Sequence, residues 1–424
     1  MSSYTYRCFQ CKTQFSSDEI EQNHHYLCPN CGEANSRMPL KGLLLIEYPY
    51  DKLGQIYTRE QFLKFPPGQF WRYPYLLPLD RKEVEQNSPF RGISWDELFS
   101  GILPSHKLRL QKMGQHEVWI FDDTNNPTFS YKDRASILVA LKAKQMGVSA
   151  ISAASTGNAG SSMAGICARL GLEAHIWVPE SIPEGKLMQM LAYGAQVYLV
   201  KGDYDHAFDL CLEISRKMNW YNRNTAYNPL TLEGKKSGAF DIFLSMKGSL
   251  PKYIFVPVGD GVILGGIFKG FQELRYLGFI KSLPRLVAVQ SSGSDALVRY
   301  LATGRFEYQP VDTLADSISA GAPRNLYYAA HAVRESGGFA IAVEDSEMVE
   351  AQKMIGEKMG ILAEPAAAAS LAGYLKVQDK LELTRGQKPL LLLTGSGLKD
   401  VDSLKRLHRR PIALEEELWR ERFE

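Results

Sequence analysis

Residues 148–171 read VSAISAASTGNAGSSMAGICARLG and contain the pattern that decides the fold. The run 148–154 is short and apolar, as expected of a buried β-strand. A polar turn with glycines follows at 155–160, and then a helical pattern that Gly171 is placed to end as a C-terminal cap. The stretch therefore predicts one strand–loop–helix unit of an α/β protein.

The same alternation continues along the chain from about residue 115. Short apolar runs alternate with segments of helical spacing such as 204–218, which is typical of βαβ units around a mostly parallel sheet. The predicted strands are 117–121, 148–154, 174–179, 196–200, 252–258, 285–290 and 389–394.

Composition and charge narrow the class of protein. The 424 residues are 45% hydrophobic and 23% charged, with a formal net charge of +2, as in a globular protein long enough for more than one core. This balance indicates neither nucleic acid nor a membrane surface as a partner. The first residues lack the apolar core of a signal peptide, and the apolar runs are too short to cross a bilayer. We therefore expect a cytoplasmic protein.

Four of the six cysteines form two C-x2-C pairs separated by 16 residues, which is within the range of a four-thiolate zinc ribbon. The four are Cys8, Cys11, Cys28 and Cys31. Because four thiolates complete a tetrahedral site, the histidines at 24–25 are not needed as ligands and the zinc is expected to be structural. The sequence predicts a zinc ribbon at 1–36.

A segment rich in proline and aromatic residues follows the cysteines. Residues 37–100 show no clear period, and we expect them to wrap around a catalytic core. Their aromatic stretch 65–77 is expected to pack on that core or on a second copy in a homodimer. Residues 101–424 are expected to form the core, with a smaller α/β subdomain at about 135–245.

Lys132 is the first candidate for chemistry, because ligands of open α/β sheets bind beyond the carboxyl ends of strands. It follows the strand predicted at 117–121 and stands at the start of an amphipathic helix. The helix N-terminus, with Phe129 and Tyr131 nearby, would lower the pKa of its amine, and a neutral amine is what attacks a carbonyl. Alone, the lysine could equally pair with Asp133 or reach solvent.

Three further strand-end loops offer complementary groups. The loop 155–160 presents hydroxyls and the N–H groups of a helix start, which suit a carboxylate or phosphate, although a capped glycine-rich helix start reads the same way. The loop 259–266, GDGVILGG, offers a similar phosphate cradle. Thr394 ends the last predicted strand, where its hydroxyl could hydrogen-bond a ring nitrogen.

Other enzyme classes fit less well. GDGVILGG lacks the glycine spacing of the dinucleotide fingerprint, and the strand after it ends in Gln290 rather than an acidic residue. The sequence contains no GK[ST] ending of a P-loop, no HExxH and no GxSxG motif.

Together, the loops resemble a known family. The motifs SYKDR, STGN, NPLTLEGKKSGAFDI, VGDGVILGG, EPAAAASLAG and LTGSGLKD occur in the order found in the tryptophan-synthase β-like enzymes that use pyridoxal 5'-phosphate (PLP), most similarly in threonine synthases. The resemblance covers about 95–400 and implies two Rossmann-like three-layer αβα domains with mostly parallel sheets. Many threonine synthases also carry a short N-terminal zinc-binding segment.

The resemblance implies a role for each loop. Lys132 would bind the cofactor aldehyde and move protons, Asn158 would contact the 3-hydroxyl, and Thr394 would contact the ring nitrogen. The cofactor phosphate would be held by Gly259, Asp260, Gly261, Val262 and Ile263. The substrate would be bound by Ser155, Thr156, Gly157, Asn158 and the residue at position 231.

The chain departs from the family pattern where the substrate phosphate would bind. The family's NPxRxEGxK reads NPLTLEGKK, so Thr231 stands where an arginine would grip that phosphate. Threonine cannot make such a charge-assisted contact, and Lys235 or Lys236 would have to replace it as a point charge. Phe129 and Tyr131 replace a glycine and a phenylalanine, so we expect a bulkier entrance beside the reactive lysine.

The function implied is that of a PLP-dependent lyase of amino-acid biosynthesis. It would eliminate phosphate from O-phosphohomoserine by β,γ-elimination and add water to give threonine. Thr231 motivates an alternative within the class: a serine/threonine dehydratase, a diaminopropionate ammonia-lyase or a cysteate-synthase-like enzyme. An alternative from another class is a zinc-ribbon regulatory protein whose enzyme core is inactive.

Overall fold

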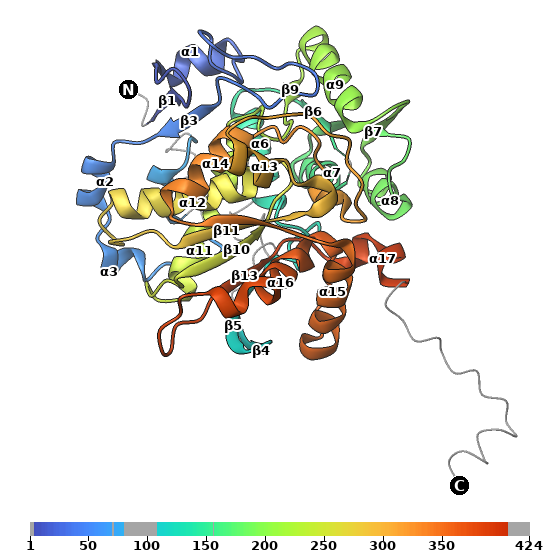
Figure 1. Ribbon diagram of the computed structural model, residues 1–424. Coiled ribbons are helices and arrows are strands. Elements are labelled where there is room, and N and C mark those ends of the chain that lie inside the picture. Colours follow the sequence, from blue (N-terminus) through green and yellow to red (C-terminus); the bar gives the residue numbers. More distant parts are fainter. Residues whose placement is uncertain (1–3, 70–71, 80–107, 156, 406–424) are drawn as a thin grey trace, which may run out of the picture.

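The computed structural model describes residues 4–69, 72–79, 108–155 and 157–405 (Figure 1). Much of the segment predicted to wrap the core, at 80–100, lies outside the described residues, as does Thr156. None of the helices in the described part combines the length and apolar character that a bilayer crossing requires.

The cysteine-bearing N-terminal unit is a small antiparallel sheet. Strand β1 (Thr5–Cys8) pairs with both β2 (Gln14–Ser16) and β3 (Leu44–Glu47). Helix α1 (Ser17–Gln22) follows β2, and α2 (Tyr50–Ile56) and α3 (Arg59–Phe62) continue along the same flank of the molecule (Figure 1).

The aromatic stretch packs on the chain's own core. Tyr73 and Leu76 are buried, and the Tyr73 ring meets the Phe240 ring edge-on at 5.1 Å on α11 (Ser237–Ser245). Offset and edge-on aromatic pairs of this kind add to the burial of apolar surface. Of the two expectations for 65–77, packing on the core therefore holds for its described residues.

The smaller parallel sheet has the order β8-β7-β6-β9. Its strands are β6 (Ala150–Ala154), β7 (Glu173–Pro179), β8 (Gln196–Val200) and β9 (Tyr221–Asn222), and its helices are α7 (Asn158–Leu170), α8 (Glu184–Ala192) and α9 (Tyr204–Met218). The chain runs outward from β6 to β8 and then returns to β9, so right-handed crossovers place α7 and α8 on one face and α9 on the other. Gly171 ends α7 in the left-handed conformation, as predicted.

The larger sheet has the order β12-β11-β10-β13-β5-β4 and is parallel except for its edge strand β4. Its strands are β4 (Leu108–Met113), β5 (His116–Asp122), β10 (Tyr253–Pro257), β11 (Arg285–Ser291), β12 (Phe339–Val343) and β13 (Leu390–Leu393). Along β10, Ile254 and Val256 face one hydrophobic core and Phe255 faces another, because successive side chains point to opposite faces. Both faces are thus buried.

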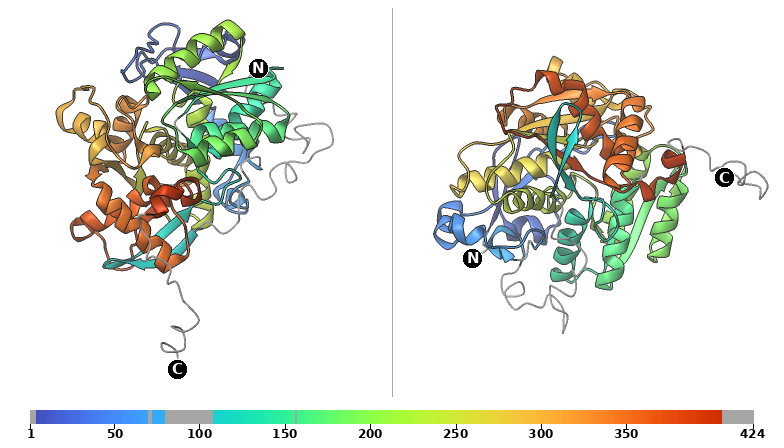
Figure 2. Two further views of the ribbon diagram at one scale, coloured as in Figure 1. Left: turned by 90° about the vertical axis from the view of Figure 1, so that its right-hand side faces the viewer. Right: turned by 90° about the horizontal axis from the view of Figure 1, so that it is seen from below.

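Helices cover the two faces of the larger sheet. Helix α16 (Pro365–Val377) packs across β10 to β13 with α15 (Asp345–Met359) behind it. Helix α12 (Val262–Tyr276) contacts β10 and β11, and α14 (Leu326–Glu335) contacts β11 and β12. The remaining helices are α6 (Asp133–Gln145), α10 (Leu230–Lys235), α13 (Ala296–Thr303) and α17 (Val401–Lys405). Figure 2 shows the smaller sheet and its helices, in green, as one lobe beside the larger one.

All seven predicted strands are present. Of the strands in the two larger sheets, β4, β9 and β12 were not predicted, and β12 was missed although its five residues are all apolar. β4 has a single buried residue, β9 has two residues, and β12 is mostly half-buried. A strand at a sheet edge or of two residues is selected by its neighbours rather than by its own sequence.

Helix α10 lies so close to α6 that only glycine fits at position 234. A Cβ on Gly234 would lie 2.3 Å from the Arg134 carbonyl oxygen, which is backbone and cannot turn away. Gly356, within α15, has nothing nearer than 4.0 Å to the same added atom.

Gly234→Ala is therefore expected to destabilise the protein by about 1–3 kcal/mol through overpacking. Gly356→Ala, the matched control, is expected to stabilise it by about 0.5–1 kcal/mol through helix propensity. Thermal unfolding of both variants tests this, and equal midpoints would contradict the packing described.

Candidate active site

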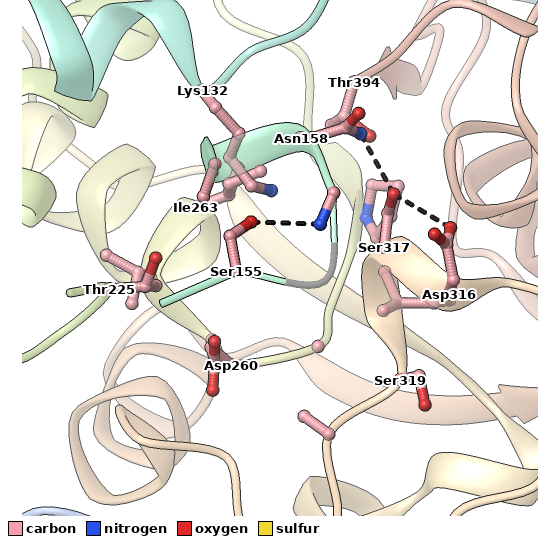
Figure 3. A pocket seen from close by; sticks show the side chains of 18 of the residues that line it. Lys132, Ser155, Asn158, Thr225, Asp260, Ile263, Asp316, Ser317, Ser319 and Thr394 are labelled. Atoms are coloured by element: carbon pink, nitrogen blue, oxygen red, sulfur yellow. Dashed lines mark hydrogen bonds between the residues drawn. The ribbon is translucent and has the colours of Figure 1, made fainter. Parts of the chain in front are cut away.

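Loops from the smaller and the larger parallel sheet meet at one cavity (Figure 3). From the predicted cofactor site it is lined by Lys132, Asn158, Gly259, Asp260, Gly261, Val262, Ile263 and Thr394, and from the predicted substrate site by Ser155 and Gly157. The loops follow β5, β6, β10 and β13, so the cavity lies beyond the carboxyl ends of parallel strands, where ligands of such sheets bind.

Lys132 directly precedes α6 and projects into the cavity (Figure 3). Two residues after Lys132, in the first turn of α6, Arg134 is buried. It makes ion pairs with Asp123 (Nε to Oδ2, 2.7 Å) and Asp241 (Nη1 to Oδ2, 2.6 Å). These two carboxylates belong to the end of β5 and to α11. The start of α6 is thereby fixed between them.

Asp133 does not neutralise Lys132. Its carboxylate accepts hydrogen bonds from the Thr128 N–H (2.8 Å) and the Ser162 hydroxyl (2.6 Å). Among the described residues, Lys132 is in no ion pair within 4.0 Å, so the simple pairing considered from the sequence does not occur.

The pKa of the Lys132 amine is lowered, chiefly by burial. Glu364 and Asp260 act in the opposite direction, and Arg223 and Lys186 lower the pKa further. The expected direction is therefore confirmed: the site favours the neutral, nucleophilic amine.

The two aromatic residues beside Lys132 do not crowd the cavity. Phe129 is 39% exposed, with a φ of 66° that glycine adopts more readily, and Tyr131 is fully buried with its hydroxyl donating to the Lys235 carbonyl at 2.8 Å. Neither lines the cavity. The expectation of a bulkier entrance is wrong, because the Tyr131 ring is buried away from the cavity and the partly exposed Phe129 ring does not line it.

The loop 259–263 ends at the start of α12. Gly261 is the N-cap residue with a φ of 82° and no side-chain cap, so the first N–H groups of α12 have no capping side chain. A Cβ on Gly261 would lie 2.7 Å from the Ala329 Cβ. An uncapped helix N-terminus that lines a cavity suits an anion.

The loop after β6 is held by Ser155, whose hydroxyl accepts from the N–H groups of Gly157 (3.0 Å) and Gly160 (2.9 Å). Asn158 donates its Nδ2 to both carboxylate oxygens of Glu364, at 2.8 and 3.0 Å, and to the Ser317 hydroxyl at 3.0 Å. Its Oδ1 is buried without a hydrogen-bond partner. A ligand hydroxyl would satisfy this atom.

Thr394 closes the cavity from the end of β13. Its carbonyl accepts from the Tyr131 N–H at 2.8 Å, and its side chain lines the cavity. Gly395 follows it beneath Glu364, where a Cβ would lie 2.3 Å from a carboxylate oxygen. The turn after β13 is thereby set against the start of α16.

Several residues that line the cavity or act on Lys132 were not assigned a role from the sequence. Those that line it are Tyr204, Thr225, Asp316 and Ser317, and those that act on Lys132 are Lys186, Arg223 and Glu364. Lys186 pairs with Asp316 and lies 4.0 Å from Glu364. Glu364 opens the EPAAAAS motif and could have been found there, whereas Asp316 and Ser317 lie in a single 3-10 turn whose sequence shows no pattern.

Thr231 is not brought to the cavity. It is fully buried, its hydroxyl donates to the Asn228 carbonyl (2.7 Å), and its Oγ1 accepts from the Ala226 N–H (3.2 Å). Both bonds stay within its own turn. Among the described residues it therefore offers no group to a ligand of this cavity.

Lys236, one of two lysines considered as its replacement, is also occupied. It belongs to a buried network in which it pairs with Glu233 and Glu273 (2.8 Å), and Lys269 pairs with the same two carboxylates. Two cations and two anions balance there. Lys235 alone of the pair lines the cavity.

The four predicted zinc ligands lie together at the tip of the N-terminal sheet. Their sulfur atoms lie within 4.8 Å of one another, with 3.4 Å between Cys8 and Cys31 and 3.6 Å between Cys11 and Cys28. These distances exceed the 2.03–2.05 Å of a disulfide, and all four thiols are free. Four thiolates in such a cluster suit a tetrahedral zinc ion.

Arg324 connects this N-terminal unit to the cavity. Its guanidinium donates to the carbonyls of Asn35 (3.3 Å) and Met38 (3.0 Å) and pairs with Asp205 on α9. Its backbone N–H donates to the Asp260 carboxylate at 3.0 Å. The cysteine unit therefore buttresses the loop that begins α12.

The residues at the cavity fit PLP. An amine with a lowered pKa suits its aldehyde, the unpaired Asn158 Oδ1 suits a ring hydroxyl, and the uncapped start of α12 suits a phosphate. The Thr394 hydroxyl suits a ring nitrogen.

Comparisons with known proteins agree with this fit. A family model described as pyridoxal-phosphate dependent enzyme matches residues 98–395. The threonine synthase of Methanocaldococcus jannaschii is 34% identical over 416 residues, 96% of each chain. That of Methanosarcina acetivorans is 32% identical over 403 residues, 94% of this chain and 92% of its own. The structure of maize serine racemase has a TM-score of 0.62 at 18% identity, over 71% of this chain and 91% of its own, and shares the fold.

Proposed function

This chain belongs to the family of pyridoxal-phosphate dependent enzymes, and we propose that it converts O-phosphohomoserine and water to threonine and phosphate. It is a PLP-dependent lyase of the threonine-synthase-like kind. The observation that carries the substrate assignment is the meeting of a reactive amine, an anion cradle and unpaired cations in one cavity, in a chain with nearly full-length threonine synthase relatives.

The cofactor would be held by residues of all four loops. Lys132 would bind the aldehyde, Asn158 the 3-hydroxyl and Thr394 the ring nitrogen. The phosphate would lie at the start of α12, over residues 259–263, where Gly261 allows close approach. When bound, PLP stores the electron pair left by a bond broken at the substrate Cα.

The protein's own part is binding and proton transfer. The first turn of α7, with Ser155 and Gly157, would bind the substrate α-carboxylate through backbone N–H groups. Lys132, released from the aldehyde, would carry protons between Cα, Cβ and Cγ as phosphate leaves Cγ and water adds at Cβ. Burial keeps its amine ready to accept a proton.

A second candidate is a lyase that acts on an unphosphorylated amino acid, such as serine or threonine. Thr231 favours it, because threonine supplies no charge where the family's arginine binds the substrate phosphate. A panel of O-phosphohomoserine, serine, threonine and phosphoserine separates the two, scored by phosphate, threonine and keto-acid release. Keto acid from serine or threonine, without phosphate release from O-phosphohomoserine, would establish the second.

We further propose that Cys8, Cys11, Cys28 and Cys31 bind one structural zinc ion. The clustering of the free thiols supports it. All four positions of a tetrahedral ion would be filled, which leaves none for catalysis. The ion would stabilise a unit with too small a core to fold on its own.

Lys132→Ala is expected to abolish the visible absorbance of lysine-bound cofactor in the purified protein, because the amine assigned to the aldehyde is removed. Phosphate release should fall by roughly 10²-fold or more through loss of the proton carrier. Lys201→Ala, which changes an exposed lysine, is the control. Retained absorbance in Lys132→Ala would refute the assignment of this lysine.

Glu364→Gln tests the electrostatics of the site. The Glu364 carboxylate raises the pKa of Lys132, so removing its charge lowers that pKa further and leaves more neutral amine at any given pH. The rate of PLP uptake by the cofactor-free protein should then reach its half-maximum at lower pH. Glu357→Gln, on the exposed side of α15, should leave the pH profile unchanged. A shift to higher pH in Glu364→Gln would contradict the model of the site.

Cys28→Ser is expected to remove the zinc and lower the midpoint of thermal unfolding. Metal content by elemental analysis should fall from one zinc per chain to none. Cys167→Ala, which changes a buried cysteine of α7 outside the cluster, should keep the metal. Equal zinc content in the two variants would disprove the site.

A further inference from the structure

Two buried cations beside the cavity have unpaired donors. Lys235 and Arg223 are both 0% exposed. Within the described part of the chain, Lys235 Nζ and Arg223 Nε and Nη2 make no hydrogen bond. Buried cations are ordinarily paired, because desolvation without a partner strongly destabilises them. An anionic ligand would satisfy both.

These cations lie next to the reacting amine. Lys235 is the last residue of α10 and lines the cavity, and Arg223 donates to the hydroxyl of Thr225, which also lines it, at 2.8 Å. Besides burial, Lys132 and Arg223 lower the pKa of Lys235, and Asp260 acts against them. Two cations thus act on Lys235 against one carboxylate, that of Asp260, which already accepts a backbone N–H.

We propose that Lys235, supported by Arg223, binds the phosphate group of a phosphorylated amino-acid substrate in this chain. The inference rests on the proposed function and names the residue that takes over from the arginine missing at position 231. A phosphate ester is the anion that matches two cations with several unpaired N–H donors. Lys235 would also stabilise the charge that grows on the phosphate as it leaves Cγ.

The cofactor phosphate is the other anion in the cavity, and it has a separate cradle. Residues 259–263 offer backbone N–H groups at the start of α12 for it. Lys235 belongs to the end of α10, outside that cradle, and its carbonyl accepts from Tyr131, the residue that precedes Lys132. We therefore assign its side chain to the substrate.

Two contacts fix the backbone of Lys235 beside the cavity. Tyr131 donates its hydroxyl to the Lys235 carbonyl at 2.8 Å. On the other side α12 approaches closely, and a Cβ on Gly266 would lie 2.7 Å from the Lys235 Cβ. Tyr131 thus helps to hold the backbone from which the Lys235 side chain extends.

Binding is tested on the PLP-loaded enzyme with inorganic phosphate as the probe. With PLP bound, the cradle of α12 is filled, so calorimetry reports a second anion site. We expect one phosphate site in the parent protein, at least tenfold weaker binding in Lys235→Gln, and retained binding in Lys235→Arg. Lys281→Gln, which removes an exposed lysine, should bind as the parent does. Equal phosphate binding in Lys235→Gln and the parent would overturn the proposal.

Kinetics and PLP affinity identify the source of the phosphate. Lys235→Gln should raise KM for O-phosphohomoserine by roughly 10- to 100-fold, the range expected when a hydrogen bond to a charged group is lost. Its PLP affinity, from absorbance titration of the cofactor-free protein, should change less than about twofold. Weakened PLP binding with an unchanged KM would assign Lys235 to the cofactor phosphate and overturn the proposal.

The two hypotheses fail in distinguishable ways. If the parent enzyme releases no phosphate from O-phosphohomoserine, the proposed function fails, yet the calorimetric test of Lys235 still applies. If the parent is active and Lys235→Gln has unchanged KM and phosphate binding, only this inference fails. Misfolding is not expected to obscure the result, because removing an unpaired buried cation should leave the thermal midpoint equal or higher.

Discussion

The buried ion pairs of Arg134 with Asp123 and Asp241 are the constraint on which the active site depends. They join the end of β5, the start of α6 and α11, and so fix the turn from which Lys132 projects. Each partner is buried, so the loss of one would leave an uncompensated charge, which typically destabilises a protein by about 3–5 kcal/mol. The reactive lysine is therefore held by interactions in which it takes no part.

Two groups of buried charge serve different ends in this protein. Lys236 and Lys269 are balanced against Glu233 and Glu273 where α10 meets α12, and Tyr48 and Tyr50 donate to the same two carboxylates. One residue earlier, Lys235 faces the cavity with no partner among the described residues. A charge left unpaired in a folded core reduces stability, and a ligand that pairs with this charge on binding recovers the lost free energy.

One arginine links the N-terminal unit to the cavity. The Arg324 guanidinium donates to two carbonyls of the segment that follows the cysteines. Its backbone N–H donates to the carboxylate of Asp260, in the loop that precedes α12. The cysteines are far along the chain from that loop but are mechanically linked to it through one arginine. Order in this unit thus contributes to the shape of the anion cradle.

The sequence by itself determined the parallel α/β core, its seven apolar strands, the cysteine cluster and the loops that carry Lys132, Asn158 and Thr394. Hydrophobic periodicity, turn residues and the order of motifs are properties of the sequence itself, so they can be recognised without a structure. Tertiary structure alone decided that Thr231 turns into its own loop, that Phe129 and Tyr131 leave the entrance clear, and that Lys235 rather than Lys236 reaches the cavity. Neighbouring helical residues point about 100° apart, so which of two adjacent lysines meets a ligand depends on the helices packed around them.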